Sequence, residues 1–287
     1  MAVVRLTYKL TSGQANIIDL ARGISLTERR MIHQKQVFTI LGGMIVDDAI
    51  DTKLKLSVAP NNFYTRNAVS RGFRAWKAMR AKTLENSASG TTPKYSDFKV
   101  LLDGTASSNY LNPFSAGSVE LTDGEWNYAD LTSESAPGVN KQLIIVGDVH
   151  TSSKYSLAKG WLETRPKPHL LNPEYQDLNS NGVEDVAEDF LNTLNQDSTE
   201  VTERMNEIVN ENDQHPFPRS ELMTTQSAYS ATEPCNLQLQ FIHHAAANEV
   251  SSSVPGFQAL CGLIRADVQG GSDPILIIDV ETKGWNF

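Results

Sequence analysis

Hydrophobic and polar residues alternate along several short stretches of this chain, as they do in strands that bury one face. In residues 3–10 the apolar side of the alternation is Val4, Leu6, Tyr8 and Leu10. Residues 52–60 alternate in the same way and stop at a proline. Apolar runs predict further strands at 16–21, at 36–48 with a bulge or bend at its two glycines, at 142–150, as a strand pair within 151–173, and at 235–246, 259–268 and 274–282.

The period changes in residues 61–86, where Val69, Phe73, Trp76 and Met79 recur at spacings of four and three. This spacing predicts a helix with one apolar stripe. Six cations occupy the rest of its circumference: Arg66, Arg71, Arg74, Lys77, Arg80 and Lys82. From residue 52 to residue 84 the chain has eight cations and no carboxylate.

Two more helical stretches are expected. Ser25 and Glu28 have the spacing of a capping box, which predicts a short helix over residues 26–34. Residues 174–213 carry twelve carboxylates and one cation, and their apolar positions predict two amphipathic helices.

Strands at irregular spacing, long loops and the absence of a strand–helix–strand rhythm favour a mainly β protein over a doubly wound α/β sheet. We expect an antiparallel β-sandwich or jelly roll with one basic amphipathic helix and an inserted acidic helical segment. Residues 1–287 would form one such domain, with the insertion at 174–213. The strand pattern alone does not distinguish one jelly roll from two small stacked barrels.

The charge of the chain is unevenly distributed. Residues 1–100 contain 16 Lys and Arg against 7 Asp and Glu, whereas the remainder contains 9 against 27, which gives the net charge of −9. Such asymmetry indicates one surface that meets a polyanion and another that meets solvent or cations.

Other features bear on location and redox state. No run of apolar residues is long enough for a membrane span, and the first residues lack the pattern of a signal peptide. We therefore expect synthesis in the cytoplasm. Cys235 and Cys261 lie in apolar runs and are expected to be buried free thiols.

The basic helix allows two interpretations. It can be a helix that covers a sheet and keeps a solvated cationic face. Alternatively, its cations hold nucleic-acid phosphates at a fixed surface while Phe73 and Trp76 anchor the other side, in contacts that are independent of base sequence and weaken with salt. The lack of balancing acids in an acidic protein favours the second interpretation.

The stretch "DLNSNGVEDVAE", residues 177–188, has the ligand spacing of a calcium-binding loop. Gly182 falls at the tight turn, and Glu184 stands where such loops usually have an apolar residue. The competing interpretation is an acidic helix N-terminus, where carboxylates favour the helix dipole. The candidate calcium ligands are Asp177, Asn179, Asn181, Val183 through its carbonyl, Asp185 and Glu188.

The sequence gives little support for catalysis. Asp148 and His150 at the end of an apolar strand resemble the first metal motif of calcineurin-like metallophosphoesterases, but the later ligand motifs of that family are missing. His243 and His244 are neighbours within a predicted strand, so they should point to opposite faces. We therefore expect a protein that is not an enzyme.

Two segments resemble parts of the capsid proteins of small circular single-stranded DNA viruses that encode a replication initiator. They are "NNFYTRNAVSRGFRAWKAMRAKTLENSASGTTPKYSDFKVLLDG" (61–104) and "NENDQHPFP" (210–218). The resemblance implies a jelly-roll coat protein of the virion that self-assembles into a closed icosahedral shell around DNA. Many such proteins have an Arg-rich N-terminal arm, whereas this chain starts with a predicted strand.

Three functions are thus carried forward. The first is a capsid protein whose helix at 66–82 contacts the genome and whose acidic loop binds calcium at a subunit contact. The second is a calcium-binding β-sandwich that acts as an interaction module. The third is a metal-dependent phosphoesterase.

Overall fold

The computed structural model describes residues 3–47, 52–85, 97–115, 119–132, 140–147, 153–163, 237–244, 251–270 and 273–282. The chain divides into two compact units, one of residues 1–161 with 221–287 and one of residues 162–220. Nearly all described residues belong to the first unit. The predicted acidic helices at 174–213 lie outside the described residues.

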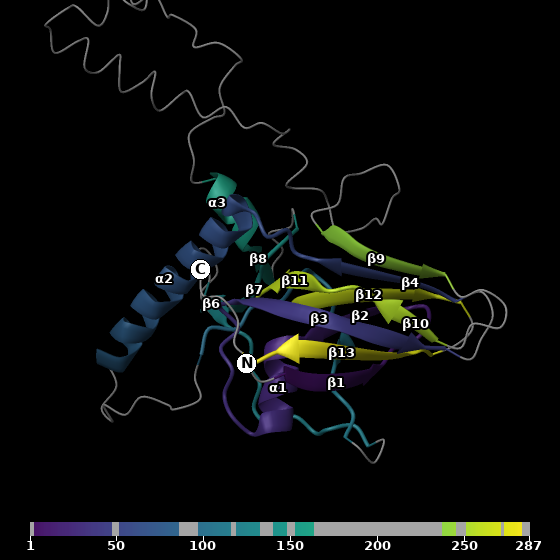
Figure 1. The fold of residues 1–287 in the computed structure, drawn as a ribbon. Helices are drawn as coiled ribbons and strands as arrows, with labels where there is room; N and C mark the ends of the chain where they lie inside the picture. Colours follow the sequence, from purple (N-terminus) through teal and green to yellow (C-terminus); the bar gives the residue numbers. More distant parts are fainter. Residues whose placement is uncertain are drawn as a thin grey trace, which may run out of the picture. The chain divides into compact units, whose positions relative to one another are not determined.

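The first unit is mainly β, as the alternation of the sequence predicts (Figure 1). Two five-stranded sheets carry most of its strands. Sheet A has the order β1 (Val3–Lys9), β13 (Ile275–Glu281), β3 (Val37–Val46) and β10 (Ser251–Val254), with β11 (Phe257–Leu260) also paired to β3. Sheet B has the order β5 (Tyr110–Leu111), β2 (Ala15–Asp19), β12 (Leu263–Gln269), β4 (Lys53–Val58) and β9 (Gln238–His244).

The strands pair from the ends of the chain inward. β1 pairs with β13, β2 with β12, β3 with β10 and β11, and β4 with β9, and every one of these pairs is antiparallel. β10 and β11 act as one strand interrupted at Pro255–Gly256, because both follow β3 in register. Two further antiparallel pairs, β13 with β3 and β12 with β4, join the ladder into the two sheets.

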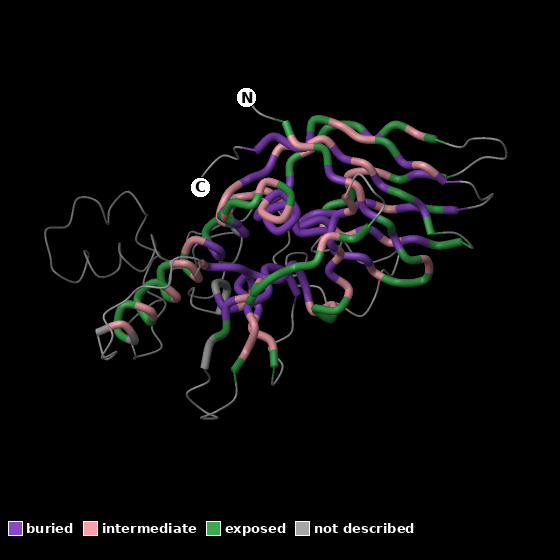
Figure 2. The backbone as a smooth tube through the Cα atoms, turned by 90° about the horizontal axis from the view of Figure 1, so that it is seen from below, coloured by how far each residue is buried: buried purple, intermediate pink, exposed green. Residues whose placement is uncertain are grey.

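The inward faces of both sheets supply one hydrophobic core, which makes the unit a β-sandwich. Leu6 and Tyr8 of β1 and Phe38 of β3 are buried from sheet A, and Leu56 of β4 and Ile264 of β12 are buried from sheet B. In Figure 2 buried positions recur along the strands between intermediate and exposed ones. The period-2 pattern of the strands accounts for this, since alternate side chains point to opposite faces.

The chain between β4 and β9, residues 59–237, is a long insertion in the strand ladder and carries the remaining described elements apart from a short helix between β2 and β3. They are α2 (Phe63–Glu85), the 3-10 turn η1 (Ser107–Asn109), α3 (Leu157–Glu163) and a small three-stranded sheet of β6 (Asp130–Thr132), β7 (Asn140–Ile144) and β8 (Lys154–Ser156). In this sheet β7 pairs antiparallel with β6 and parallel with β8. Within the described residues, no helix combines the length and the hydrophobicity that crossing a bilayer requires.

The first helix lies earlier than predicted. α1 spans Leu20–Glu28 rather than 26–34, because Asp19 caps it by accepting a hydrogen bond from the Arg22 N–H. The Ser25 hydroxyl donates to the Ala21 carbonyl and accepts from the Ile32 N–H, so it lies within the helix and does not start one. The capping-box prediction is therefore wrong.

Two strand predictions also need correction. The run 259–268 is not one strand, because the chain reverses at Cys261–Gly262 between β11 and β12, with Cys261 at φ 57°. Of the region predicted as a strand pair at 151–173, the structure describes residues 153–163, which form one short strand, β8, followed by α3 and not by a second strand. Cys261 is a buried free thiol as predicted, and Cys235 lies outside the described residues.

Candidate nucleic-acid interface

The basic helix of the sequence is α2, and its first turn is fixed by local side chains. The Asn62 Oδ1 accepts a hydrogen bond of 2.9 Å from the Thr65 N–H, the arrangement of a helix N-cap. The Thr65 hydroxyl donates to the Pro60 carbonyl, which ties the turn to the end of β4. Arg66 donates through Nε to Asn61 Oδ1 at 2.7 Å. The helix therefore starts from a fixed point on sheet B.

The apolar stripe of α2 packs against the sandwich unit along its first half. Val69 is buried, and the rings of Phe73 and Trp76 lie 5.6 and 5.9 Å from the ring of Phe98. Gly72 faces α3 so closely that a Cβ there would lie 2.7 Å from a methyl group of Leu157. These contacts hold the helix against other residues of the segment 59–237.

Met79, the last residue of the predicted stripe, is exposed instead of buried. Trp76, the preceding residue of the stripe, is half-buried and its ring contacts Phe98. In Figure 2 the second half of α2 is exposed or intermediate along its length. The stripe is thus a packing surface near β4 and a partly open one beyond Trp76.

The predicted phosphate-binding residues lie on the solvent side of α2. Arg66, Arg71, Arg74, Lys77 and Lys82 are exposed, and Arg80 is half-buried. Arg71, Arg74 and Lys77 follow one another at intervals of three residues, so they form a slanted row on one side of the helix. For these three side chains, no carboxylate of the described residues lies within ion-pair distance.

Two cations cover aromatic rings of the stripe. Arg80 lies over the Trp76 ring at 5.2 Å, and Lys35 lies over the Phe73 ring at 4.4 Å. Each contact is a cation–π interaction, which holds positive charge beside the helix. The basic surface therefore extends from α2 to Lys35, a residue that the sequence pattern did not single out.

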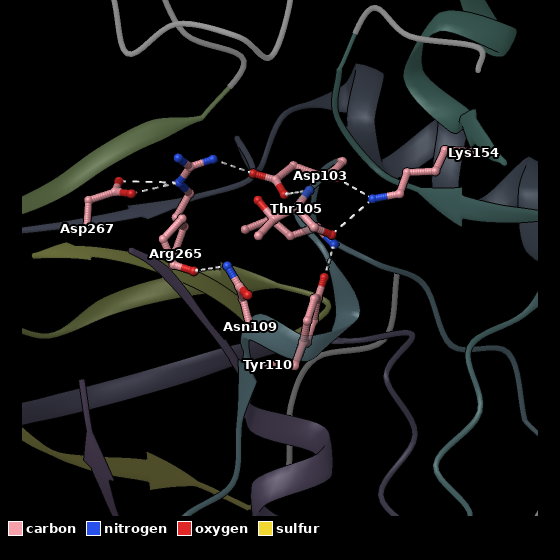
Figure 3. Close-up of polar contacts among 10 residues, drawn as sticks. Asp103, Thr105, Asn109, Tyr110, Lys154, Arg265 and Asp267 are labelled. Carbon is pink, nitrogen blue, oxygen red and sulfur yellow. Dashed lines mark hydrogen bonds and ion pairs between the residues drawn. The ribbon is translucent and has the colours of Figure 1, made fainter. Parts of the chain in front are cut away.

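A buried ionic cluster on sheet B joins the segment 59–237 to the sandwich (Figure 3). Arg265 of β12 donates through Nη1 to Asp103 Oδ2 at 2.7 Å and through Nε to Asp267 Oδ1 at 3.0 Å. Asp103 is 1% exposed and also accepts from the Thr105 N–H. The Lys154 ammonium donates to the Thr105 carbonyl at 3.0 Å, and its desolvation lowers its pKa. Because every charge here has a partner, the cluster is structural.

A second buried polar group is the Asp19 carboxylate at the junction of β2 and α1. Besides the Arg22 N–H, it accepts hydrogen bonds from Gln34 Nε2, Trp126 Nε1 and the Tyr128 hydroxyl, at 3.2 to 3.3 Å. Desolvation raises the pKa of Asp19 to about 6, although the hydrogen bonds and the Arg22 charge lower it. This carboxylate fastens the loop at 126–128 to the end of sheet B. The sequence signal that could have identified Asp19 is the position of an Asp directly before a helix.

The structure describes only some of the other predicted site residues. The candidate calcium ligands Asp177, Asn179, Asn181, Val183, Asp185 and Glu188 lie outside the described residues, as do Asp148 and His150. No group of three or more metal-ligating side chains occurs in the part of the chain that the structure describes. His243 is buried and His244 exposed, which confirms that they point to opposite faces of β9.

Known proteins add no assignment. The chain matches no known family model, and it is not significantly similar to any curated protein or solved structure.

Proposed function

We propose that this chain is a capsid protein that assembles with copies of itself into a closed shell around a nucleic acid. The observation that carries the proposal is the pairing of strands from the chain ends inward. A hairpin of eight strands that folds over produces this order, and on this ground we infer that the β-sandwich is a jelly roll, a fold of viral capsid proteins and also of lectins and cupins.

Because one fold serves several functions, the choice among them depends on surfaces. The segment that resembles coat proteins of small circular single-stranded DNA viruses, residues 61–104, includes all of α2 and the Phe98 on which α2 packs. Arg71, Arg74 and Lys77 of α2 are exposed, and no carboxylate of the described residues lies within ion-pair distance of them. This arrangement suits a surface that neutralises phosphates.

In this proposal α2 faces the genome, single-stranded DNA, on the inner side of the shell. The anchored first half fixes the direction of the helix, and the exposed cations then contact phosphates without reading bases. The acidic loop at 177–188 would bind calcium where subunits meet, since a cation reduces repulsion between carboxylates. The protein would be a component of the virion.

Negative-stain electron microscopy of the purified chain tests the assembly. We expect uniform closed particles. If they form only when calcium is present and not with a chelator, the loop at 177–188 is an assembly site. Particles in both conditions would remove calcium from the proposal, and monomers in every condition would contradict the capsid function.

A charge reversal tests the nucleic-acid surface. In Arg74→Glu/Lys77→Glu/Arg80→Glu we expect much lower nucleic-acid content in assembled particles and weaker binding of single-stranded oligonucleotides. Loss of three phosphate contacts should reduce the slope of log affinity against log salt by about 2. Filter binding at several salt concentrations measures the slope.

The matched control is Arg29→Glu/Arg30→Glu/Lys53→Glu, which makes the same charge change at three exposed cations outside α2. If the control reduces binding as much as the α2 variant does, net charge is responsible and α2 is not the interface. Intact particles with unchanged nucleic-acid content in the α2 variant would also contradict the assignment. Thermal unfolding of both variants checks that they fold.

A further inference from the structure

The outer face of sheet A carries an unusual concentration of exposed apolar side chains. Among the described residues, eight large apolar side chains are exposed, and four of them lie on this face. Their exposed fractions are 40% to 53%, for Val3, Leu41, Met44 and Ile275. The half-buried Ile277 and Val46 extend the same surface. Contiguous exposed apolar surface of this kind marks interaction sites.

The strand register places these residues in rows across the sheet. Thr7 of β1, Ile277 of β13 and Met44 of β3 are neighbours in one row, and Lys9, Ile275 and Val46 form the next. The row before them is Arg5, Asp279 and Gly42.

Gly42 leaves a hollow in the middle of the face. A groove of about 430 Å³ lies there, with Leu41 and Met44 on its β3 side and Val3 and Arg5 on its β1 side. Leu41 is the most exposed of the four apolar side chains and is the direct neighbour of Gly42. A projecting side chain and a hollow therefore adjoin on the same strand.

The charges of the face are nearly balanced, although the chain carries a net charge of −9. Arg5 donates to both oxygens of Asp279 at 2.7 and 2.8 Å, and Lys9 lies 3.7 Å from Asp273. The remaining carboxylate, Glu281 beside Val3, is only 8% exposed. Two copies of an acidic protein can approach each other at such a face without strong repulsion.

We propose that the outer face of sheet A docks against the same face of a second copy, with Leu41 of each copy over Gly42 of the other. In a two-fold contact each surface meets itself, so a projection beside a hollow is complementary to its own image. Arg5 and Asp279 can exchange partners across the same axis. The inference deepens the proposed function, from which it takes the second copy, by assigning one subunit contact of the shell.

Sedimentation velocity of the purified full-length chain over a range of concentrations tests the contact. We expect dimers or larger species for the natural sequence. Leu41→Glu and Gly42→Leu should weaken association by at least about tenfold, because one buries a charge in the contact and the other fills the hollow. A side chain at Gly42 is compatible with the fold, since the nearest atom to its Cβ would be the Val254 carbonyl oxygen at 3.4 Å.

The matched control is Ile242→Glu, at an apolar residue of similar exposure on β9 of sheet B. Thermal unfolding establishes that each variant is folded, and Leu41→Ala, which adds no charge, should weaken association in the same direction. Association of Leu41→Glu and Gly42→Leu at natural strength would overturn the contact. So would loss of association in Ile242→Glu alone.

Microscopy of the same samples separates this inference from the proposed function. Particles formed equally by all variants would overturn the contact and leave the capsid function standing, whereas dimers without particles would support the contact and contradict the shell. A natural chain that stays monomeric at every concentration overturns both. Association that persists in the variants but disappears when residues 283–287 are removed would assign the contact to that tail instead.

Discussion

Replacing Gly43 by alanine should destabilise the sandwich strongly, whereas the same replacement at Gly42 should not. A Cβ on Gly43 would lie 2.3 Å from the carbonyl oxygen of Ile277 and 3.1 Å from Cγ2 of Ile278. The oxygen belongs to the backbone of β13, so it can move only if β3 and β13 separate. We expect a loss of roughly 3 kcal/mol or more in the free energy of unfolding, at the upper end for overpacked sites.

The Gly42→Ala variant is the internal comparison. Its Cβ has ordinary contact distances, and neither glycine has a positive φ. Because alanine also reduces the freedom of the unfolded chain, Gly42→Ala should be neutral or slightly stabilising, by up to about 1 kcal/mol. Urea unfolding of the unassembled chain measures both. Equal losses in the two variants, or a Gly43→Ala chain as stable as the natural one, would show that β3 and β13 are not so closely paired.

The two glycines also show what the sequence can predict. Their place within an apolar run indicates a bulge, and the β3–β13 register does shift there, between Asp279 and Val280. Alternation identified β1 and β4 because each of these strands buries one side, and an apolar run identified β13. The length and spacing of the stripe identified α2 in the same way.

Other features were missed because their signal is not local. Cys261 and Gly262 lie in a continuous apolar run, so hydrophobicity does not reveal the reversal between β11 and β12. The Asp103–Arg265 ion pair joins residues 162 positions apart. Only the packing of the segment 59–237 on sheet B brings them together.

The pairing order of the strands is only partly local, because the strands are predicted by local pattern and their partners are not. The local pattern predicts each strand by itself. It does not predict that β1 pairs with β13, or that β4 pairs with β9 across the segment 59–237. Such pairs close long loops, and the entropy lost on closing them is offset only by burial of the shared core. The strand assignments therefore depend on local pattern, and the topology depends on the complete core.

The buried Asp19 carboxyl should make the stability of the chain fall as pH rises from about 4 to about 6. Its pKa is about 6 in the folded protein, above the ordinary 3.8, because burial disfavours the charged form. In this interval the folded state binds more protons than the unfolded state, so deprotonation favours unfolding. The stabilisation is fully present below about pH 4 and is lost once pH exceeds 6. A shift of this size corresponds to roughly 3 kcal/mol.

Asp19→Asn isolates this contribution, since asparagine occupies the same space without titrating. The difference in unfolding free energy between the natural chain and Asp19→Asn should shrink between pH 4.5 and 6.5 and then stay constant to pH 7.5, in urea titrations of the unassembled protein. Asp279→Asn is the control. The hydrogen bond from Arg5 lowers the pKa of Asp279 below 3.8, so its loss should shift the curve without changing its shape in this range. If the natural and Asp19→Asn curves run parallel, then Asp19 stays ionised in the fold and its four donors outweigh its desolvation.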